Sequence, residues 1–159
     1  MAFKETTGHL VKAGLVKPCP TDVQAITKLI RRAYLDLRTA KRNLEEDQEC
    51  TYTYAYNAML RSGLALMFSE GYRPEIKDKH RTIVRFASAV LGEGFHRLIT
   101  DYDFMRKKRH QFIYEPDIPC SMTEASEALN TARTFVDQVA ESIRAKSPQR
   151  EFHFGKEPS

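Results

Sequence analysis

Apolar residues recur at steps of three and four along most of this chain, and this helical spacing is the feature that most limits its fold. The pattern begins behind Pro18 and Pro20, which bar a helix from running through them. Thr21 and Gln24 have the spacing of a capping box at a helix start. A helix of about seven turns is therefore expected to run to about Glu46, with one apolar face. That face comprises Val23, Ile26, Ile30, Ala33, Leu37 and Ala40.

The next two predicted helices end at glycines. Residues 48–69 carry apolar side chains nearly all round a helix, so we expect the central and most enclosed helix there. Gly71 is placed to take the left-handed conformation that closes this helix. A third helix is predicted over residues 79–91, and it stops at Gly92 and Gly94.

Two further helices complete the pattern. A fourth runs from Phe95 up to Pro116, which prevents its continuation. A fifth begins at Ser121, which forms a capping-box spacing with Glu124, and ends before Pro148. Five helices joined by short loops, without a convincing strand, predict an all-α fold. Its expected form is an antiparallel up-and-down bundle of about five helices.

The bundle is predicted to form one domain over residues 21–147. Residues 1–20 are an N-terminal segment that leads into it, with one short helix over residues 10–16. The sequence leaves open whether this segment packs on the bundle. Residues 148–159 are expected to form a flexible C-terminal tail, in which Phe152 and Phe154 could dock on a neighbour.

Composition excludes several classes of protein. The 159 residues hold 25 Lys and Arg against 21 Asp and Glu, and no apolar stretch is long enough to span a membrane. Three cysteines without a C-x-x-C pair are typical of reduced thiols, and the start resembles no signal peptide, so a cytoplasmic location is expected. No spacing of His, Asp or Glu indicates a metal site, and the common nucleotide and hydrolase motifs are absent. We therefore expect no metal, no cofactor and no membrane partner.

The feature most indicative of function is a basic run, Arg106 to Arg109, followed by His110 in the predicted fourth helix. The formal net charge of the chain is only +4, so the concentration of cations at one place, rather than the total, favours phosphate binding. The simpler interpretation is a solvated basic face balanced by nearby acids, because charge runs usually are solvated faces. Those acids are Asp101, Asp103 and Glu115.

Helical geometry places the residues of the basic run on different faces of the helix, because successive residues turn by about 100°. Arg106, His110 and Tyr114 fall on one polar and aromatic line. Arg109 instead shares the side of the apolar seam, where an arginine is costly unless it meets an acid, a partner subunit or a bound phosphate. Arg109 is therefore the residue to test first. The two residues left for solvent are Lys107 and Lys108.

Together these residues resemble the HEPN domain family (higher eukaryotes and prokaryotes nucleotide-binding). The resemblance rests on the helical bundle, the runs Ala55 to Leu60 and Gly71 to Pro74, His80, and the pair Arg109 and His110. It covers most of the chain. It implies a dimer of helical bundles and, as in many members, a metal-independent endoribonuclease of toxin-antitoxin or defence systems, often beside a small nucleotidyltransferase. Taken by itself, His80 is interpreted as a helix-start or loop-packing residue.

The signature of the resembled family is R-x(4–6)-H, often with a polar residue directly after the arginine. Arg109 takes the arginine place and His110 the polar place, while Tyr114 stands where the final histidine would fall, as in a subset of the family. The other registration, Arg106 with His110, leaves only three residues between them. Histidine titrates near pH 6.5 and tyrosine near pH 10, so Tyr114 is a poor base for RNA cleavage. This substitution predicts weak or absent ribonuclease activity.

The leading hypothesis is therefore a dimeric helical bundle that binds RNA or a nucleotide through the fourth helix. One alternative is an active endoribonuclease, in which Arg109 acts with His110 or with a perturbed Tyr114 as the catalytic residues. A second alternative is a protein-interaction module that partners a nucleotidyltransferase or an antitoxin. The candidate residues of the leading hypothesis are Arg106, Lys107, Lys108, Arg109, His110 and Tyr114.

Overall fold

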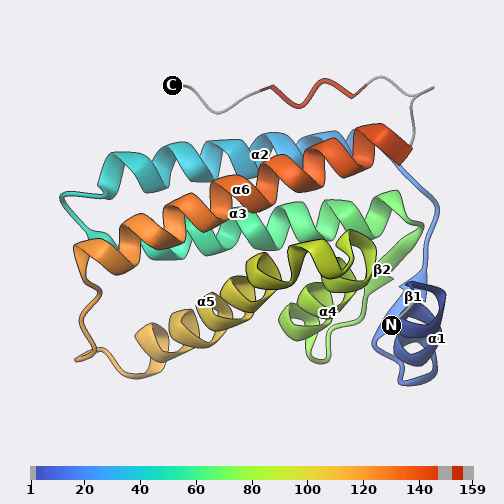
Figure 1. The fold of residues 1–159 in the computed structure, drawn as a ribbon, viewed down its shortest axis with the longest axis horizontal. Helices are drawn as coiled ribbons and strands as arrows, with labels where there is room; N and C mark the ends of the chain where they lie inside the picture. Colours follow the sequence, from blue (N-terminus) through green and yellow to red (C-terminus); the bar gives the residue numbers. More distant parts are fainter. Residues whose placement is uncertain (1–2, 147–151, 156–159) are drawn as a thin grey trace.

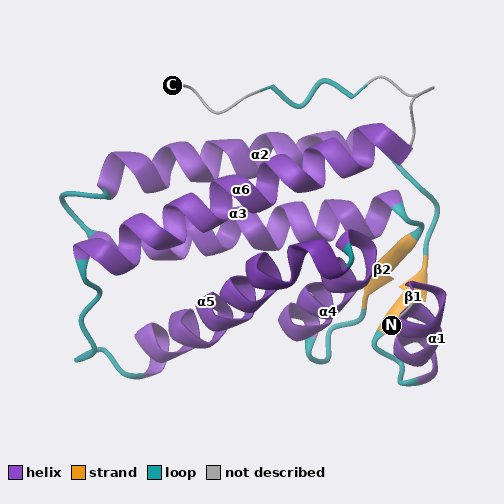
Figure 2. Ribbon diagram, viewed as in Figure 1, coloured by secondary structure: helices purple, strands orange, loops and turns teal. Residues whose placement is uncertain are grey.

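The computed structural model describes residues 3–146 and 152–155 (Figure 1). Three long helices, α2 (Val23–Asn43), α3 (Gln48–Ser69) and α6 (Met122–Lys146), lie side by side. Two shorter helices, α4 (Lys79–Leu91) and α5 (His96–Tyr114), pack on another side of α3. The pairs α2/α3 and α5/α6 run in opposite directions (Figure 1). The predicted all-α bundle is confirmed, and helix dominates the described residues (Figure 2).

Helix α3 is the centre of the bundle, as its apolar composition predicts. It packs against α2, α4, α5 and α6, and its side chains are buried on most of its circumference. The side chains of Tyr56, Met59 and Leu66 are completely buried. Gly71 follows with a φ of +85°, the left-handed conformation that ends a helix at little cost only for glycine. Both the limits and the position of this helix agree with the sequence-based prediction.

Of the two N-terminal caps predicted for the other long helices, the one for α2 is wrong and the one for α6 is confirmed. Helix α2 is capped by Asp22, whose Oδ1 accepts from the amides of Gln24 and Ala25 at 3.0 and 3.2 Å, and not by Thr21 as predicted. A carboxylate one residue later satisfies the same free amides and suits the positive helix start better. The α6 capping box is confirmed, with the Glu124 amide donating to Ser121 Oγ at 3.0 Å and the Ser121 amide to Glu124 Oε1 at 3.4 Å.

The N-terminal segment differs from the prediction and packs on the bundle. Helix α1 spans Phe3–Lys12, so the short helix predicted over residues 10–16 is misplaced. Strand β1 (Val16–Pro18) pairs antiparallel with β2 (Tyr72–Pro74), although no convincing strand was expected. This pairing joins segments far apart in the sequence, so no local periodicity reveals it. Leu10 anchors the segment because its side chain is completely buried in the core.

The described part of the C-terminal segment is anchored as well. Phe154 is buried, and the guanidinium carbon of Arg144 lies 4.9 Å above its ring. Arg31 Nε on α2 donates to the carbonyl of His153 at 2.6 Å. The flexible tail predicted for residues 148–159 otherwise lies outside the described residues. Within residues 3–146 and 152–155, no helix combines the length and apolar composition of a membrane span.

Helix α4 approaches α3 closely because a glycine faces it. Gly63 is buried on α3, and a Cβ added there would lie closer than 3.0 Å to Cγ2 of Ile83 on α4. Ile83 itself is completely buried. The first turn of α4 is thereby held near the middle of α3, where Tyr56 lies. A short 3-10 helix, η1 (Glu93–Phe95), then connects α4 to α5.

Candidate functional site

The basic run lies near the C-terminal end of α5, and most of its charge is paired locally. Asp103 accepts from Arg106 Nε at 2.9 Å, and its other oxygen lies 3.3 Å from Lys107 Nζ. Lys108 reaches across to α6, where its Nζ lies 3.4 Å from Glu124 Oε2. Its side chain is only 21% exposed, so the prediction that Lys108 faces solvent is wrong. Lys107, at 66% exposure, does face solvent.

Arg109 is the exception in this run. Its guanidinium carbon lies 5.3 Å above the ring of Tyr56, and the half-buried side chain leans into the bundle as predicted. No carboxylate among residues 3–146 and 152–155 pairs with it, and its buried Nε has no hydrogen-bond partner there. The aromatic face stabilises the cation, but the N–H donors of the guanidinium still require acceptors. Arg109 is therefore the cation of the run that is available to an anion.

His110 and Tyr114 lie on the solvent side of α5. Both are exposed, Tyr114 at 70%, and their ring centroids are 4.5 Å apart. The Tyr114 ring contacts the ring of His110, one turn earlier on the same helix. The predicted line of Arg106, His110 and Tyr114 is thus divided, since Arg106 is held by Asp103 and only 25% exposed.

A second histidine, which the sequence interpretation treated as a packing residue, lies beside the arginines. His80, at the start of α4, has its Nδ1 2.9 Å from Tyr56 Oη. The His80 and Tyr56 rings stack with centroids 5.8 Å apart and an angle of 27° between planes. Arg109 lies over the same tyrosine ring. Three helices therefore bring a histidine, a tyrosine and an arginine to one place, a juxtaposition that no spacing in the sequence indicates.

The electrostatics of this cluster keep both rings uncharged at neutral pH. Burial, together with the positive charges of Arg109, Lys79 and Arg106, lowers the pKa of His80 below its ordinary value. Burial raises the pKa of Tyr56 to about 12, although Arg109 and Arg106 act in the opposite direction. Tyr56 is therefore a protonated phenol and His80 a neutral imidazole that can accept a proton. We call His80, Tyr56 and Arg109 the three-helix cluster.

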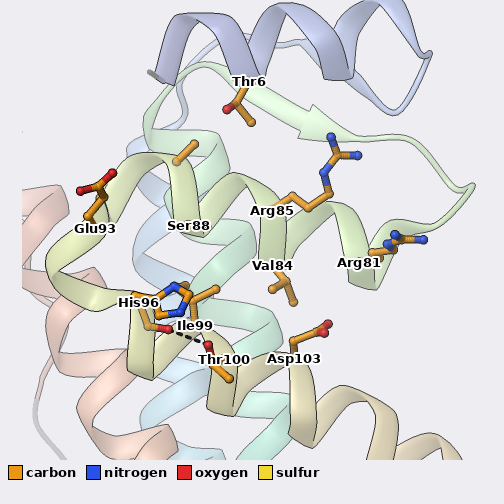
Figure 3. Close-up of a pocket in the computed structure, with 12 residues that line it drawn as sticks. Thr6, Arg81, Val84, Arg85, Ser88, Glu93, His96, Ile99, Thr100 and Asp103 are labelled. Atoms are coloured by element: carbon orange, nitrogen blue, oxygen red, sulfur yellow. Dashed lines mark hydrogen bonds between the residues drawn. The ribbon is translucent and has the colours of Figure 1, made fainter. Parts of the chain in front are cut away.

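A groove of about 860 Å³ lies on the other side of α4, between α1, α4 and α5 (Figure 3). Arg81 and Arg85 project from α4 into this region, and Thr100 and Asp103 face it from α5 (Figure 3). Asp103, which holds Arg106, thus lies between the groove and the basic run. The described residues that line the groove include no member of the three-helix cluster.

A comparison with protein families identifies the fold around this cluster. A model of the HEPN domain family matches residues 26–143, more than half of the chain and most of the length from α2 to α6. The chain belongs to the HEPN domain family. HEPN domains are helical domains associated with nucleotide binding and RNase activity. No curated protein and no solved structure was found to match the chain.

Proposed function

We propose that this HEPN domain binds RNA, and that Arg109 holds a phosphate of the bound strand. The observation that carries the proposal is the free guanidinium of Arg109, which lies at the junction of α3 and α5 without an acid partner among the described residues. Phosphate oxygens are the acceptors that a planar guanidinium binds best, and RNA presents them at every nucleotide.

The exposed side chains around Arg109 are suited to binding single-stranded RNA. Tyr114 and His110 offer aromatic faces on which unpaired bases can stack. Lys107, exposed near the same end of α5, adds positive potential, although it shares Asp103 with Arg106, and Lys108 is paired with Glu124. We infer that Arg109 gives the dominant phosphate contact and that the others assist it. A free nucleotide carries the same phosphate chemistry and would compete for this place.

The residues exposed on α5 provide little catalytic power for RNA cleavage. Tyr114 is a 70% exposed phenol at the end of the helix, and His110 is an exposed ring in contact with Tyr114 rather than with Arg109. From α5 alone we therefore propose weak or absent ribonuclease activity. Homodimer formation, a nucleotidyltransferase or antitoxin partner, and a cytoplasmic location stay predictions.

Binding can be tested by fluorescence anisotropy with a labelled single-stranded RNA at low salt. Arg109→Ala is expected to weaken binding about 10- to 100-fold, because a hydrogen-bonded charged contact contributes roughly 1.5–3 kcal/mol. The matched control is Arg97→Ala, on the same helix with a 91% exposed side chain paired to Asp101, and its effect is expected to stay within about twofold. Unlabelled nucleoside triphosphate as a competitor shows whether nucleotides share the site. Absence of RNA binding by the wild type, or equal weakening in both variants, contradicts the proposal.

A further inference from the structure

The three-helix cluster contains a group that RNA binding alone does not require. His80 is half-buried, and its Nδ1 is engaged with Tyr56 Oη at 2.9 Å. Its other ring nitrogen, Nε2, has no hydrogen-bond partner among residues 3–146 and 152–155. A histidine with one nitrogen fixed by a neighbour and the other free is arranged for proton transfer.

The contact with Tyr56 engages one of the two ring nitrogens of His80. The Tyr56 hydroxyl can donate to an unprotonated Nδ1 or accept from Nδ1–H, and His80 is competent as a base in the tautomer in which Nδ1–H donates to Oη. In that tautomer Nε2 carries the lone pair. The stacked ring of Tyr56 holds the imidazole in place, and the same ring lies under Arg109. The free nitrogen and the free guanidinium therefore belong to one cluster.

We propose that His80, rather than His110 or Tyr114, is the proton acceptor of a metal-independent RNA cleavage at this site. The inference rests on the proposed function, since it requires RNA whose phosphate is held by Arg109. His80 Nε2 takes the proton of a ribose 2′-hydroxyl, and the 2′-oxygen forms a bond to the adjacent phosphorus. The bond from phosphorus to the 5′-oxygen breaks, and that oxygen takes a proton from water. The hydroxide that remains takes the proton from His80 Nε2, which restores both the water and the neutral imidazole. The products are a 2′,3′-cyclic phosphate and a 5′-hydroxyl, and no oxidant, reductant or further reactant is consumed.

Arg109 has a distinct role in this step. Negative charge builds on the phosphoryl oxygens as the fifth bond to phosphorus forms, and a fixed guanidinium stabilises that charge more than it stabilises the ground state. Tyr56 is a positioning residue, because it acts on the substrate only by holding His80. The cluster thus supplies a base and a cation from different helices.

The groups around His80 determine the pH dependence. Arg109 and Arg106 on α5 and Lys79 on α4 are positive, Tyr56 on α3 is neutral, and Asp103 on α5 is bound to Arg106. Burial of the imidazole and these cations both disfavour its protonation and so lower its pKa. Cleavage is therefore expected to rise with pH, to reach half its maximum below the ordinary histidine pKa, and to be constant at neutral pH.

The test uses the full chain, a single-stranded RNA and excess EDTA, with cleavage and binding measured on the same preparations. His80→Asn is expected to lower the cleavage rate at least 100-fold while RNA affinity stays within about threefold. The matched control is His9→Asn, an exposed histidine of α1, which is expected to leave both unchanged. Tyr56→Phe keeps the ring and removes the bond to His80, so it is expected to slow cleavage about tenfold and to shift the midpoint of the pH profile.

The outcomes separate this inference from the proposed function. Wild-type protein that binds RNA without cleaving it, or His80→Asn protein that cleaves at the wild-type rate, overturns the role of His80 and leaves RNA binding intact. Wild-type protein that does not bind RNA overturns both. Loss of cleavage in His110→Asn but not in His80→Asn assigns the step to α5 and refutes the inference. Circular dichroism melting checks that each variant is folded, and Tyr56→Phe decides the matter if His80→Asn unfolds.

Discussion

Replacement of Gly63 by alanine tests how α4 comes to lie against α3. An alanine Cβ at this position would meet Cγ2 of Ile83 closer than 3.0 Å, whereas carbon atoms in good contact lie about 3.5–4.0 Å apart. Ile83 is completely buried and has no free space to enter, so α4 must shift by roughly 1 Å. Overpacking of this kind costs about 1–3 kcal/mol, and the better helix propensity of alanine offsets about 1 kcal/mol. We expect Gly63→Ala to destabilise the fold by up to about 2 kcal/mol.

A double-mutant cycle makes the reasoning sharper. Ile83→Ala removes Cγ2 and alone is expected to cost about 2–5 kcal/mol. In that background the nearest atoms to the new methyl group are Tyr102 Oη at 3.6 Å and Ile83 Cβ at 4.0 Å, both at ordinary van der Waals distances. Gly63→Ala should therefore become stabilising by about 1 kcal/mol, which gives a coupling energy of about 1–3 kcal/mol between the two sites.

The assay is equilibrium urea unfolding followed by circular dichroism. Gly8→Ala is the matched control, because Gly8 lies in α1 and an added Cβ there has nothing within 4 Å. It is expected to stabilise by up to about 1 kcal/mol through helix propensity alone. If Gly63→Ala in the wild-type background stabilises as much as Gly8→Ala does, the close approach of α4 to α3 is refuted. The position of His80 beside Tyr56 would then need another explanation.

Two further predictions concern local stability. Ser121→Ala removes the hydroxyl that accepts from the Glu124 amide at 3.0 Å and is expected to cost about 1 kcal/mol in urea unfolding. An effect no larger than that of Thr123→Ala, two residues later in the first turn of α6, would argue against the cap. The second concerns His80, whose pKa is lower in the folded than in the unfolded chain, so the unfolded state binds more protons and the free energy of unfolding rises with pH through the window just below the ordinary histidine pKa. His80→Asn should flatten that rise in melting curves between pH 5 and pH 7, and an unchanged slope would show that His80 is not the group responsible.

Much of the fold is predictable because its signals are local. The limits of α3 and α4 follow from apolar periodicity and from glycines within two residues of their ends, and the α6 start follows from a capping box within four residues. The sequence does not single out the Asp22 cap of α2, because Thr21 and Asp22 are both residues that favour this position. Only the structure shows which of the two side chains accepts from the free amides of the first turn. The β1 and β2 strands were missed because their pairing is not local and each spans three residues.

The candidate site likewise contains residues whose positions the sequence predicts and residues whose positions depend on contacts between helices. The inward lean of Arg109 is predictable from its spacing to the apolar residues of its own helix. The place of His80 is not, because it depends on how closely α4 packs on α3, and that depends on the absence of a side chain at Gly63. The burial of Lys108 likewise depends on Glu124 of another helix. Contacts between helices therefore decide which of the polar residues on α4 and α5 meet.

The central claim is that Arg109 holds an RNA phosphate, and the salt dependence of RNA binding tests it most directly. Each phosphate contact on a single strand contributes about −0.7 to the slope of log K against log salt concentration. The slope for Arg109→Ala should therefore be less steep than that of the wild type by about 0.7, while the slope for Arg97→Ala should stay unchanged. Identical slopes for the wild type and Arg109→Ala would contradict the claim.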